Sequence, residues 1–436
     1  MKDKVFDVVV VGGGFAGLSA SYYLKKQGLD HIVFERGKIA ESWRSQRWDS
    51  FRLNSTNKLN VLPGVNCDPV NEDVFWSAPE FVASMEQYVT ANQLPVAENS
   101  KVISIEKPDQ YFHVAVISND GQEIYLSRQV VIASGVSNEI KIPSIANKIS
   151  KDIKQLHSSE YRNADQLPPG VVLVVGGAQS GIQIAADLAN AGRKVFFSTS
   201  KVARLPRWYR GRDIFYWLMD LKFFDMKAEE IEDPAIFEMK PPHISAGIGK
   251  NTLSLQSLAK KGVVILSKME HASEENVFFQ SNAADHIKFA DDSSLKIKSM
   301  IDEYIETNNL DSPAPHNDEA DIPDVNGVCA SSETILAIKQ NNITSIIWST
   351  GFTADFKYLK LDVFDDNGKL KHKDGTTAIP GLYFLGYPWQ LSRKSSIIFG
   401  IKEDAKVIID SINNYSKSSF QTAQSCWNFD MDQHQV

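Results

Sequence analysis

The chain has 436 residues, too many for one ordinary hydrophobic core, and this length predicts two or three domains. A hydrophobic fraction of 43% with a charged fraction of 23% is typical of a globular protein. The formal net charge of −8 argues against a nucleic-acid partner, because proteins that bind phosphate backbones usually present a basic face.

The three cysteines, Cys67, Cys329 and Cys426, are odd in number and far apart. They therefore predict neither a disulfide framework nor a CxxC redox pair, and they favour a reducing compartment. The longest uncharged run, residues 8–24, contains glycines and follows a strand-like stretch, which argues against a signal peptide or a membrane span. We expect a cytoplasmic protein that is not bound to a membrane.

The first predicted unit is a strand, a glycine turn, a helix and a second strand. Residues 5–11 (VFDVVVV) are typical of a buried parallel strand, residues 16–28 of a helix, and residues 30–35 of the next strand. A strand-turn-helix-strand unit of this kind is the start of a doubly wound α/β domain.

The turn in this unit has the pattern GxGxxG. Gly12 permits the tight bend, Gly14 lets the backbone approach a pyrophosphate, and Gly17 lets the helix pack on the strand. The phosphates then lie at the positive helix N-terminus. Glu35 ends the second strand, where a carboxylate can accept hydrogen bonds from ribose hydroxyls. This order predicts a dinucleotide site, and a purely structural glycine turn is the alternative.

The segment that follows predicts a hairpin and a connection to a second unit. Residues 111–116 and 123–126 flank an Asn-Asp-Gly turn, which is a strong hairpin signal, and residues 130–133 form another strand. Residues 167–170 (LPPG) are typical of a connector between domains.

The second unit repeats the first. It has a strand over 171–175, a helix over 181–191 and a strand over 194–197. Its turn runs from Gly176 to Gly181, with Ala178 in place of the middle glycine. Two copies of the unit predict two doubly wound dinucleotide-binding domains.

The end of the second unit bears on coenzyme choice. Residues 198–200 (STS) carry no carboxylate, and Lys201 and Arg204 follow. An acid here would repel the 2′-phosphate of NADP, whereas hydroxyls and basic side chains can bind it. The pattern favours NADPH over NADH, although both side chains are equally compatible with solvated surface charges.

The remainder of the chain predicts peripheral structure and a return to the first sheet. Residues 211–242 are rich in aromatic residues, which favours a helical insertion that covers the second sheet, with a substrate-pocket lining as the alternative. Residues 282–324 predict a polar surface excursion with a helix over 294–308. Strands are predicted over 345–351 and 381–386, and a helix over 395–412.

The fold class predicted is therefore α/β, with two doubly wound three-layer domains. We expect a first domain in two parts, residues 1–166 and 353–436, with the second domain, residues 167–352, inserted between them. The nine histidines show no metal-ligand spacing, and no GxSxG nucleophile motif occurs. Trp43, Arg44 and Arg47 follow the first unit, where an arginine can meet phosphate and an indole can stack on a flat ring, although ordinary packing explains them equally well.

Several motifs together resemble the flavin-containing (class B) monooxygenases. They are ESWR…RWD at residues 41–49, LHSSEYR at 156–162, YRGRD at 209–213, WSTGF at 348–352 and PGLYFLG at 380–386. The group most similar is the short bacterial flavoproteins related to plant indole-pyruvate monooxygenases. The family fingerprint FxGxxxHxxxY keeps His157 and Tyr161 but has Lys151 and Ile153 in place of Phe and Gly.

The resemblance assigns two cofactors, FAD and NADPH. The residues expected to bind FAD come from the first glycine turn, from the segment that follows the first unit and from the resemblance. They are Gly12, Gly14, Phe15, Ala16, Gly17, Glu35, Arg36, Trp43, Arg44, Val102, Gly135 and Gly386. The residues implied for NADPH are Gly176, Gln179, Ser180, Gly181, Lys201 and Arg204. Asn54 is implied as an amide beside the flavin ring, with a turn asparagine as the alternative, and Arg393 faces either the flavin or the solvent.

The implied reaction is a monooxygenation. NADPH reduces the flavin, and a C4a-peroxyflavin then gives one oxygen atom of O2 to a small substrate at nitrogen, sulfur or a ketone carbonyl. An NAD(P)H oxidase or dehydrogenase without oxygen insertion is one alternative, and a non-catalytic redox-sensing flavoprotein is another. The expected partners are a small-molecule substrate and O2. The sequence leaves the oligomeric state open, with a homodimer as one option.

Overall fold

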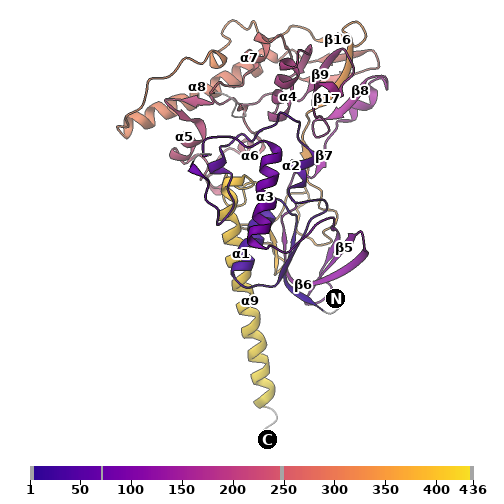
Figure 1. Cartoon of the computed structure of the whole chain (residues 1–436), viewed down its shortest axis with the longest axis vertical. Helices are drawn as coiled ribbons and strands as arrows, with labels where there is room; N and C mark the ends of the chain where they lie inside the picture. The colour runs from indigo at the N-terminus through magenta and orange to yellow at the C-terminus, as the bar shows by residue number, and fades with distance from the viewer. Residues whose placement is uncertain (1–3, 70–71, 246–249, 433–436) are drawn as a thin grey trace.

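The structure is a computed structural model that describes residues 4–69, 72–245 and 250–432, with side chains as far as Ser416. It consists of two α/β halves, and the helix α9 (Ile401–Asp432) projects from the half that contains the N-terminus (Figure 1).

The first half is built on a seven-stranded sheet. Its strand order is β3-β2-β1-β6-β5-β4, with β19 also paired to β6. The strands are β1 (Val5–Val11), β2 (His31–Phe34), β3 (Val96–Ala97), β4 (Lys101–Glu106), β5 (Phe112–Ser118), β6 (Gly121–Ile132) and β19 (Leu382–Phe384). The first part of β6 forms the predicted hairpin with β5, and its second part pairs in parallel with β1 and β19.

Alternate residues of β1 point to opposite faces of this sheet, and apolar side chains cover both faces. Val8 and Val10 join the core under α1 (Phe15–Lys26), α3 (Ala78–Asn92) and α9. Val9 and Val11 join a second core with the hairpin and the segment around residues 356–370. A strand buried on both faces must be apolar throughout, which is why residues 8–11 are four valines.

The second half is built on a five-stranded parallel sheet with the order β13-β10-β9-β17-β8. Helices α4 (Gln179–Asn190) and α7 (Leu255–Lys260) pack against it, as does a small antiparallel sheet of β14, β15 and β16. The strands are β8 (Lys154–His157), β9 (Val171–Val175), β10 (Val195–Ser198), β13 (Val264–Leu266), β14 (Met269–Ala272), β15 (Asn276–Phe279), β16 (Ile335–Ala337) and β17 (Ile343–Trp348).

The pairing of β8 corrects the domain boundary predicted at residue 166. β8 precedes that boundary, yet it pairs in parallel with β17 at the edge of the second sheet. The chain instead crosses between the halves at two short strands, β7 (Glu139–Ile140) and β18 (Phe352–Thr353), which pair with each other. The Leu-Pro-Pro-Gly connector is therefore internal to the second half.

The aromatic insertion also lies elsewhere than predicted. Its helix α5 (Ile214–Asp220) packs against α8 (Ala283–Thr307) and against Leu59 and Phe399 of the first half, not over the second sheet. The helix predicted over 294–308 is part of α8, which begins earlier. The other short elements are α2 (Glu41–Ser45), β11 (Trp208–Tyr209), β12 (Arg212–Asp213) and α6 (Ala235–Glu238).

Within the described residues, no helix is long and apolar enough to cross a membrane. In the same residues, no group of histidine, cysteine, aspartate and glutamate side chains is arranged to hold a metal ion. Cys67 and Cys329 are free thiols, and the side chain of Cys426 lies outside the described residues.

Candidate cofactor-binding site

The first glycine turn connects β1 to α1 in the geometry of a phosphate cradle. Gly12 has a φ of 111°, and a Cβ at Gly17 would overlap the carbonyl oxygen of Gly12. A Cβ at Gly14 would meet no atom within 4 Å, so the space in front of this residue is open. No side chain caps the helix here, which leaves its first N–H groups available to an anion. The turn fits a bound pyrophosphate.

Glu35 lies directly beside this turn. Its carboxylate accepts hydrogen bonds from the backbone N–H of Gly13 at 2.7 Å and of Gly37 at 2.9 Å. Burial raises the pKa of Glu35, and these two donors oppose that shift. Each carboxylate oxygen has a second lone pair. Glu35 is therefore fixed by the backbone and still able to accept hydrogen bonds from a ribose.

The second glycine turn has the same geometry as the first. Gly176 has a φ of 118°, and a Cβ at Gly181 would overlap the carbonyl oxygen of Gly176. Ala178 has φ −82° and ψ −175°, nearly the values of Gly14. Because this backbone conformation is open to any L-residue, alanine replaces glycine here without strain. α4 also lacks a side-chain cap, so this turn too can receive a phosphate.

Two residues that the sequence analysis did not single out hold the second turn in place. His243 is fully buried, and its ring lies 2.5 Å from the carbonyl oxygen of Gly177. Burial lowers the pKa of His243 to about 4, so the ring is neutral and donates from Nε2. Ile244 donates its N–H to the side chain of Gln179 at 3.0 Å. The segment before residue 246 thus fixes the start of α4.

Asn54 joins the first half of the chain to this helix. Its side-chain oxygen accepts hydrogen bonds from Gln183 at 3.0 Å and from Gln179 at 3.4 Å. Its backbone oxygen accepts one from Arg207 at 2.7 Å. The structure thus places this predicted residue at the junction of the two halves, next to the second turn.

Arg204 does not read the coenzyme as predicted. Its side chain is fully buried and forms ion pairs with Asp291 of α8, at 2.5 Å, and with Asp321. A guanidinium held in this way cannot reach a nucleotide without leaving the buried carboxylate of Asp291 without its cation and Asp321 with Lys298 alone. The prediction that Arg204 binds the 2′-phosphate is therefore corrected. The sequence did not indicate the two acidic partners, because they lie far from Arg204 along the chain.

Several lysines lie near the end of β10, where the sequence predicted that Arg204 would bind the 2′-phosphate. Lys240 donates to the hydroxyl of Ser200 at 3.1 Å, at the end of β10. Burial lowers the pKa of Lys240, and nearby Lys268 and Lys141 add to the shift. Lys201 is exposed and lies over the ring of Phe289 at 4.7 Å. None of these four lysines has a carboxylate within ion-pair distance among the residues that the structure describes.

The two arginines that follow the first unit, Arg44 and Arg47, have different surroundings. Arg44 forms an exposed ion pair with Glu86 of α3 at 2.6 Å, so a phosphate would have to displace that partner. Arg47 lies over the ring of Trp43 at 4.7 Å. Burial lowers the pKa of Arg47 to about 10, and no acidic group offsets this shift. Arg47 is thus the more suitable phosphate ligand of the two arginines.

Three of the other residues predicted for FAD follow the ends of strands of the first sheet, namely Arg36 after β2, Gly135 after β6 and Gly386 after β19. A Cβ at Gly386 would lie 3.1 Å from Ala16 of α1, so this loop reaches the first turn. Gly135 has a φ of 76° with open space beyond it. Arg36 is exposed, and its side chain donates to the carbonyl oxygen of Asn138 at 3.4 Å. Val102 is buried in the core beneath the hairpin.

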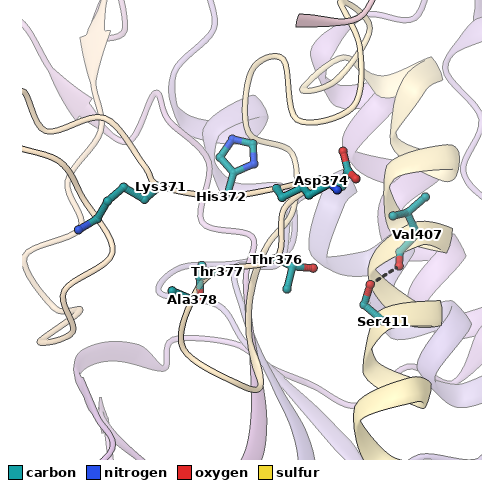
Figure 2. Close-up of a pocket in the computed structure, with 9 residues that line it drawn as sticks. Lys371, His372, Asp374, Thr376, Thr377, Ala378, Val407 and Ser411 are labelled. Carbon is teal, nitrogen blue, oxygen red and sulfur yellow. Dashed lines mark hydrogen bonds between the residues drawn. The ribbon is translucent and has the colours of Figure 1, made fainter. Parts of the chain in front are cut away.

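A cavity of about 540 Å³ opens between residues 371–378 and α9, at Val407 and Ser411 (Figure 2). None of the predicted site residues lines it. The candidate site is therefore the pair of glycine turns and not this surface cavity.

Comparison with known proteins assigns the family. Residues 9–218 match a family model described as pyridine nucleotide-disulphide oxidoreductase. An uncharacterized CzcO-like oxidoreductase of Geobacillus kaustophilus is 30% identical over 422 residues, which cover 94% of this chain and 99% of that protein. The chain belongs to the CzcO-like oxidoreductases. A probable indole-3-pyruvate monooxygenase of Arabidopsis thaliana is 26% identical to this chain over 319 residues. The match covers 67% of this chain and 73% of the plant protein.

Solved structures confirm the two-domain fold. A flavin-containing monooxygenase from Stenotrophomonas maltophilia matches the CzcO-like chain with a TM-score of 0.61 and 18% identity, over 95% of this chain and 99% of the other. A bacillithiol disulfide reductase from Bacillus cereus matches with a TM-score of 0.60 and 15% identity, over 95% and 100% of the two chains. The plant relatives and the shared fold support the resemblance to the flavin-containing monooxygenases that the motifs carry.

Proposed function

We propose that this chain is an FAD-dependent, NADPH-using monooxygenase that inserts one oxygen atom of O2 into a small organic substrate. The observation that carries the proposal is the contact of Asn54 with Gln179 and Gln183. Through it, the half with the first glycine turn meets the helix that begins at the second. Two dinucleotide cradles that share a junction are suited to bringing a nicotinamide ring to a flavin ring.

FAD would occupy the first turn. Its pyrophosphate would lie against the open face at Gly14, and a ribose would meet Glu35, whose carboxylate is already oriented by Gly13 and Gly37. Arg47, a guanidinium with no acidic partner among the described residues, is available to a phosphate.

NADPH would occupy the second turn. Its pyrophosphate would lie at the N-terminus of α4, and its 2′-phosphate would lie near Ser200 and the lysines around it. The absence of an acid at the end of β10 and the presence of Lys201, Lys240 and Lys268 support NADPH over NADH.

When bound, FAD would accept a hydride from NADPH and then react with O2. The residues of the chain would orient the two rings and keep water out. Asn54 offers an amide at the junction, and the aromatic insertion lies next to it, with Arg207 stacked 5.8 Å from the ring of Phe215. A water-poor junction favours oxygen transfer to a nitrogen, a sulfur or a ketone carbonyl over release of hydrogen peroxide.

Stopped-flow absorbance tests the proposal. The FAD-loaded protein is reduced anaerobically with NADPH and mixed with oxygenated buffer. We expect a transient species, distinct from reduced and oxidised flavin, that lasts longer when NADP⁺ is bound. Reoxidation in one step, with all electrons recovered as hydrogen peroxide in the presence of amine, sulfide and ketone substrates, would favour an NADPH oxidase.

A further inference from the structure

Arg207 is a fully buried cation at a point where three parts of the chain meet. It lies between β10 and β11 in the second half, and it forms an ion pair with Asp213, the N-cap of α5. Its Nη1 donates one hydrogen bond to the carbonyl oxygen of Asn54 at 2.7 Å and another to that of Ser245 at 3.0 Å. The guanidinium therefore contacts the first half, the aromatic insertion and the segment before residue 246.

These contacts close into a cycle of hydrogen bonds through the second glycine turn. Ser245 follows Ile244, whose N–H donates to the side-chain oxygen of Gln179 at 3.0 Å and whose carbonyl oxygen accepts from the Gln179 amide at 2.5 Å. The same amide lies 3.4 Å from the side-chain oxygen of Asn54. The cycle thus runs from Arg207 through Ser245, Ile244 and Gln179 to Asn54 and back.

The partners of Arg207 differ from those of the other buried arginine of this region. Arg204 is equally buried, but its partners Asp291 and Asp321 both lie in the second half. Arg207, in contrast, also stacks on Phe75 of the first half, with its guanidinium 4.7 Å from the ring centroid. Because a buried ion pair often adds little net stability relative to apolar packing, the contacts that Arg207 makes across the junction call for another explanation.

An arginine is suited to this position because its guanidinium is planar and carries five N–H donors in a fixed arrangement. One nitrogen supplies both carbonyl contacts and another faces the carboxylate of Asp213. A lysine ammonium is a point charge on a flexible stem, so it would keep the ion pair without this geometry. Arg393 is not part of the cycle, and its guanidinium lies 3.9 Å over the ring of Phe223.

We propose that Arg207 is a positioning residue for hydride transfer, which holds Asn54 and the first turn of α4 in one alignment. This role rests on the proposed function, because it requires a nicotinamide at the second turn and a flavin at the first. In the step concerned, a hydride leaves NADPH to give NADP⁺ and reduces the flavin by two electrons. Such a transfer depends steeply on alignment, and a displacement of about 1 Å can slow it roughly 100-fold.

The test is anaerobic stopped-flow reduction of the FAD-loaded full chain by NADPH. Arg207→Met combined with Asp213→Asn removes both charges, leaves no unpaired buried ion and keeps a side-chain oxygen to cap α5. We expect the rate constant at saturating NADPH to fall roughly 10- to 100-fold, while FAD content and the Kd for NADP⁺ stay within about twofold of the wild type. Arg207→Lys should retain part of the rate.

Hydrogen exchange of the same FAD-loaded protein, without coenzyme, is a second readout that does not depend on the reaction. In the double variant, exchange should increase in peptides that cover residues 51–57 and in those that cover residues 176–184, which belong to opposite halves. A structural defect confined to the insertion would not change both.

Arg210→Met combined with Asp302→Asn is the matched control. Arg210 joins the same insertion to Asp302 of α8 at 2.8 Å, and neither side chain bonds to Asn54 in the part of the chain that the structure describes. This control should match the wild type in reduction rate and in exchange. If the Arg207 double variant does not fold, Arg207→Lys is measured against the same control.

Three outcomes would overturn the proposal. They are an unchanged reduction rate with unchanged exchange, an equal loss of rate in the control, and a weaker Kd for NADP⁺ that accounts for the whole loss, which would make Arg207 a coenzyme ligand. A failure of the proposed function would appear in the wild type, as a flavin that NADPH does not reduce or as oxygen that is not transferred. A failure of this inference would appear only in the comparison of the variants.

Discussion

The side-chain oxygen of Asn54, in the first half of the chain, lies 3.0 Å from the amide nitrogen of Gln183 on α4, the helix of the second nucleotide turn. Gln179, at the first position of that helix, reaches the same oxygen at 3.4 Å. One carbonyl group thus receives two donors from the opposite half, while the Asn54 amide nitrogen has no hydrogen-bond partner among the described residues. We propose that this amide nitrogen donates a hydrogen bond to the flavin.

The first prediction concerns this amide. Asn54→Ala should leave FAD binding and flavin reduction by NADPH intact, because neither glycine turn is altered. The transient species should decay roughly tenfold faster, the equivalent of one hydrogen bond, and peroxide output should rise. Stopped-flow absorbance and a peroxide assay measure both. Thr90→Ala, on the exposed surface of α3, should match the wild type. An unchanged lifetime in Asn54→Ala would show that the residue only joins the two halves.

A second prediction concerns the first cradle. Gly14→Val should place its side chain in the open space in front of α1, where the pyrophosphate would lie, and should yield protein without bound FAD. The measurement is the flavin absorbance per chain after purification. Lys26→Ala, at the far end of the same helix, is the control. Full FAD occupancy in Gly14→Val would remove the basis for placing FAD at this turn.

The third prediction concerns coenzyme choice. Replacing Lys201 and Lys240 together with Ala should raise the KM for NADPH at least tenfold and leave the KM for NADH nearly unchanged. Each charge-assisted contact to the 2′-phosphate is worth about 1.5–3 kcal/mol. Initial rates of flavin reduction with each coenzyme measure the effect. Equal weakening of both coenzymes would show that these lysines do not read the 2′-phosphate.

Arg204→Ala serves as the contrasting variant. It leaves the buried carboxylate of Asp291 without a cation and Asp321 with Lys298 alone, so the expected effect is a loss of stability of about 3–5 kcal/mol. Any folded fraction should keep the NADPH preference of the wild type. A lost preference with unchanged stability would restore Arg204 as a coenzyme ligand.

The fourth prediction is a pH dependence of stability. Asp404, in the first turn of α9, is fully buried, and burial raises the pKa of its carboxyl to about 7 from the ordinary value of 3.8. Between these values the native state binds the proton and the unfolded state does not. This residue's contribution to the free energy of unfolding therefore decreases as the pH rises from about 4 to 7.

Asp404→Asn should remove this dependence. Relative to the wild type, it should be more stable by roughly 2–4 kcal/mol at pH 8 and nearly equal at pH 4. Urea unfolding of the FAD-loaded protein at several pH values measures the difference. Asp410→Asn, an exposed position on the same helix, should show no such trend. A constant difference at all pH values would mean that Asp404 does not titrate in this range.

The elements that the sequence predicted well are those with strong local signals. β1 and β9 have the predicted bounds, since both are short apolar runs that end in glycine. The carboxylate of Glu35 lies beside the first turn, where the sequence places it, because the spacing along a strand-turn-helix-strand unit determines this geometry.

The errors involve contacts between residues far apart in the sequence. Arg204 looked like a surface cation because its partners lie 87 and 117 residues away. β8 was assigned to the wrong half because its partner, β17, follows almost two hundred residues later. Lys240 and Lys268 come to the end of β10 only when two later segments fold back. Local patterns carry no information about such pairings.

The pairing of β7 with β18 has a mechanical consequence. Both passages of the chain between the halves run through one short ribbon, so that ribbon is the natural axis about which one half turns against the other. A rotation about this ribbon would have to break the contact between Asn54 and Gln183, whereas the first glycine turn and Glu35, which both lie in the first half, would keep their geometry.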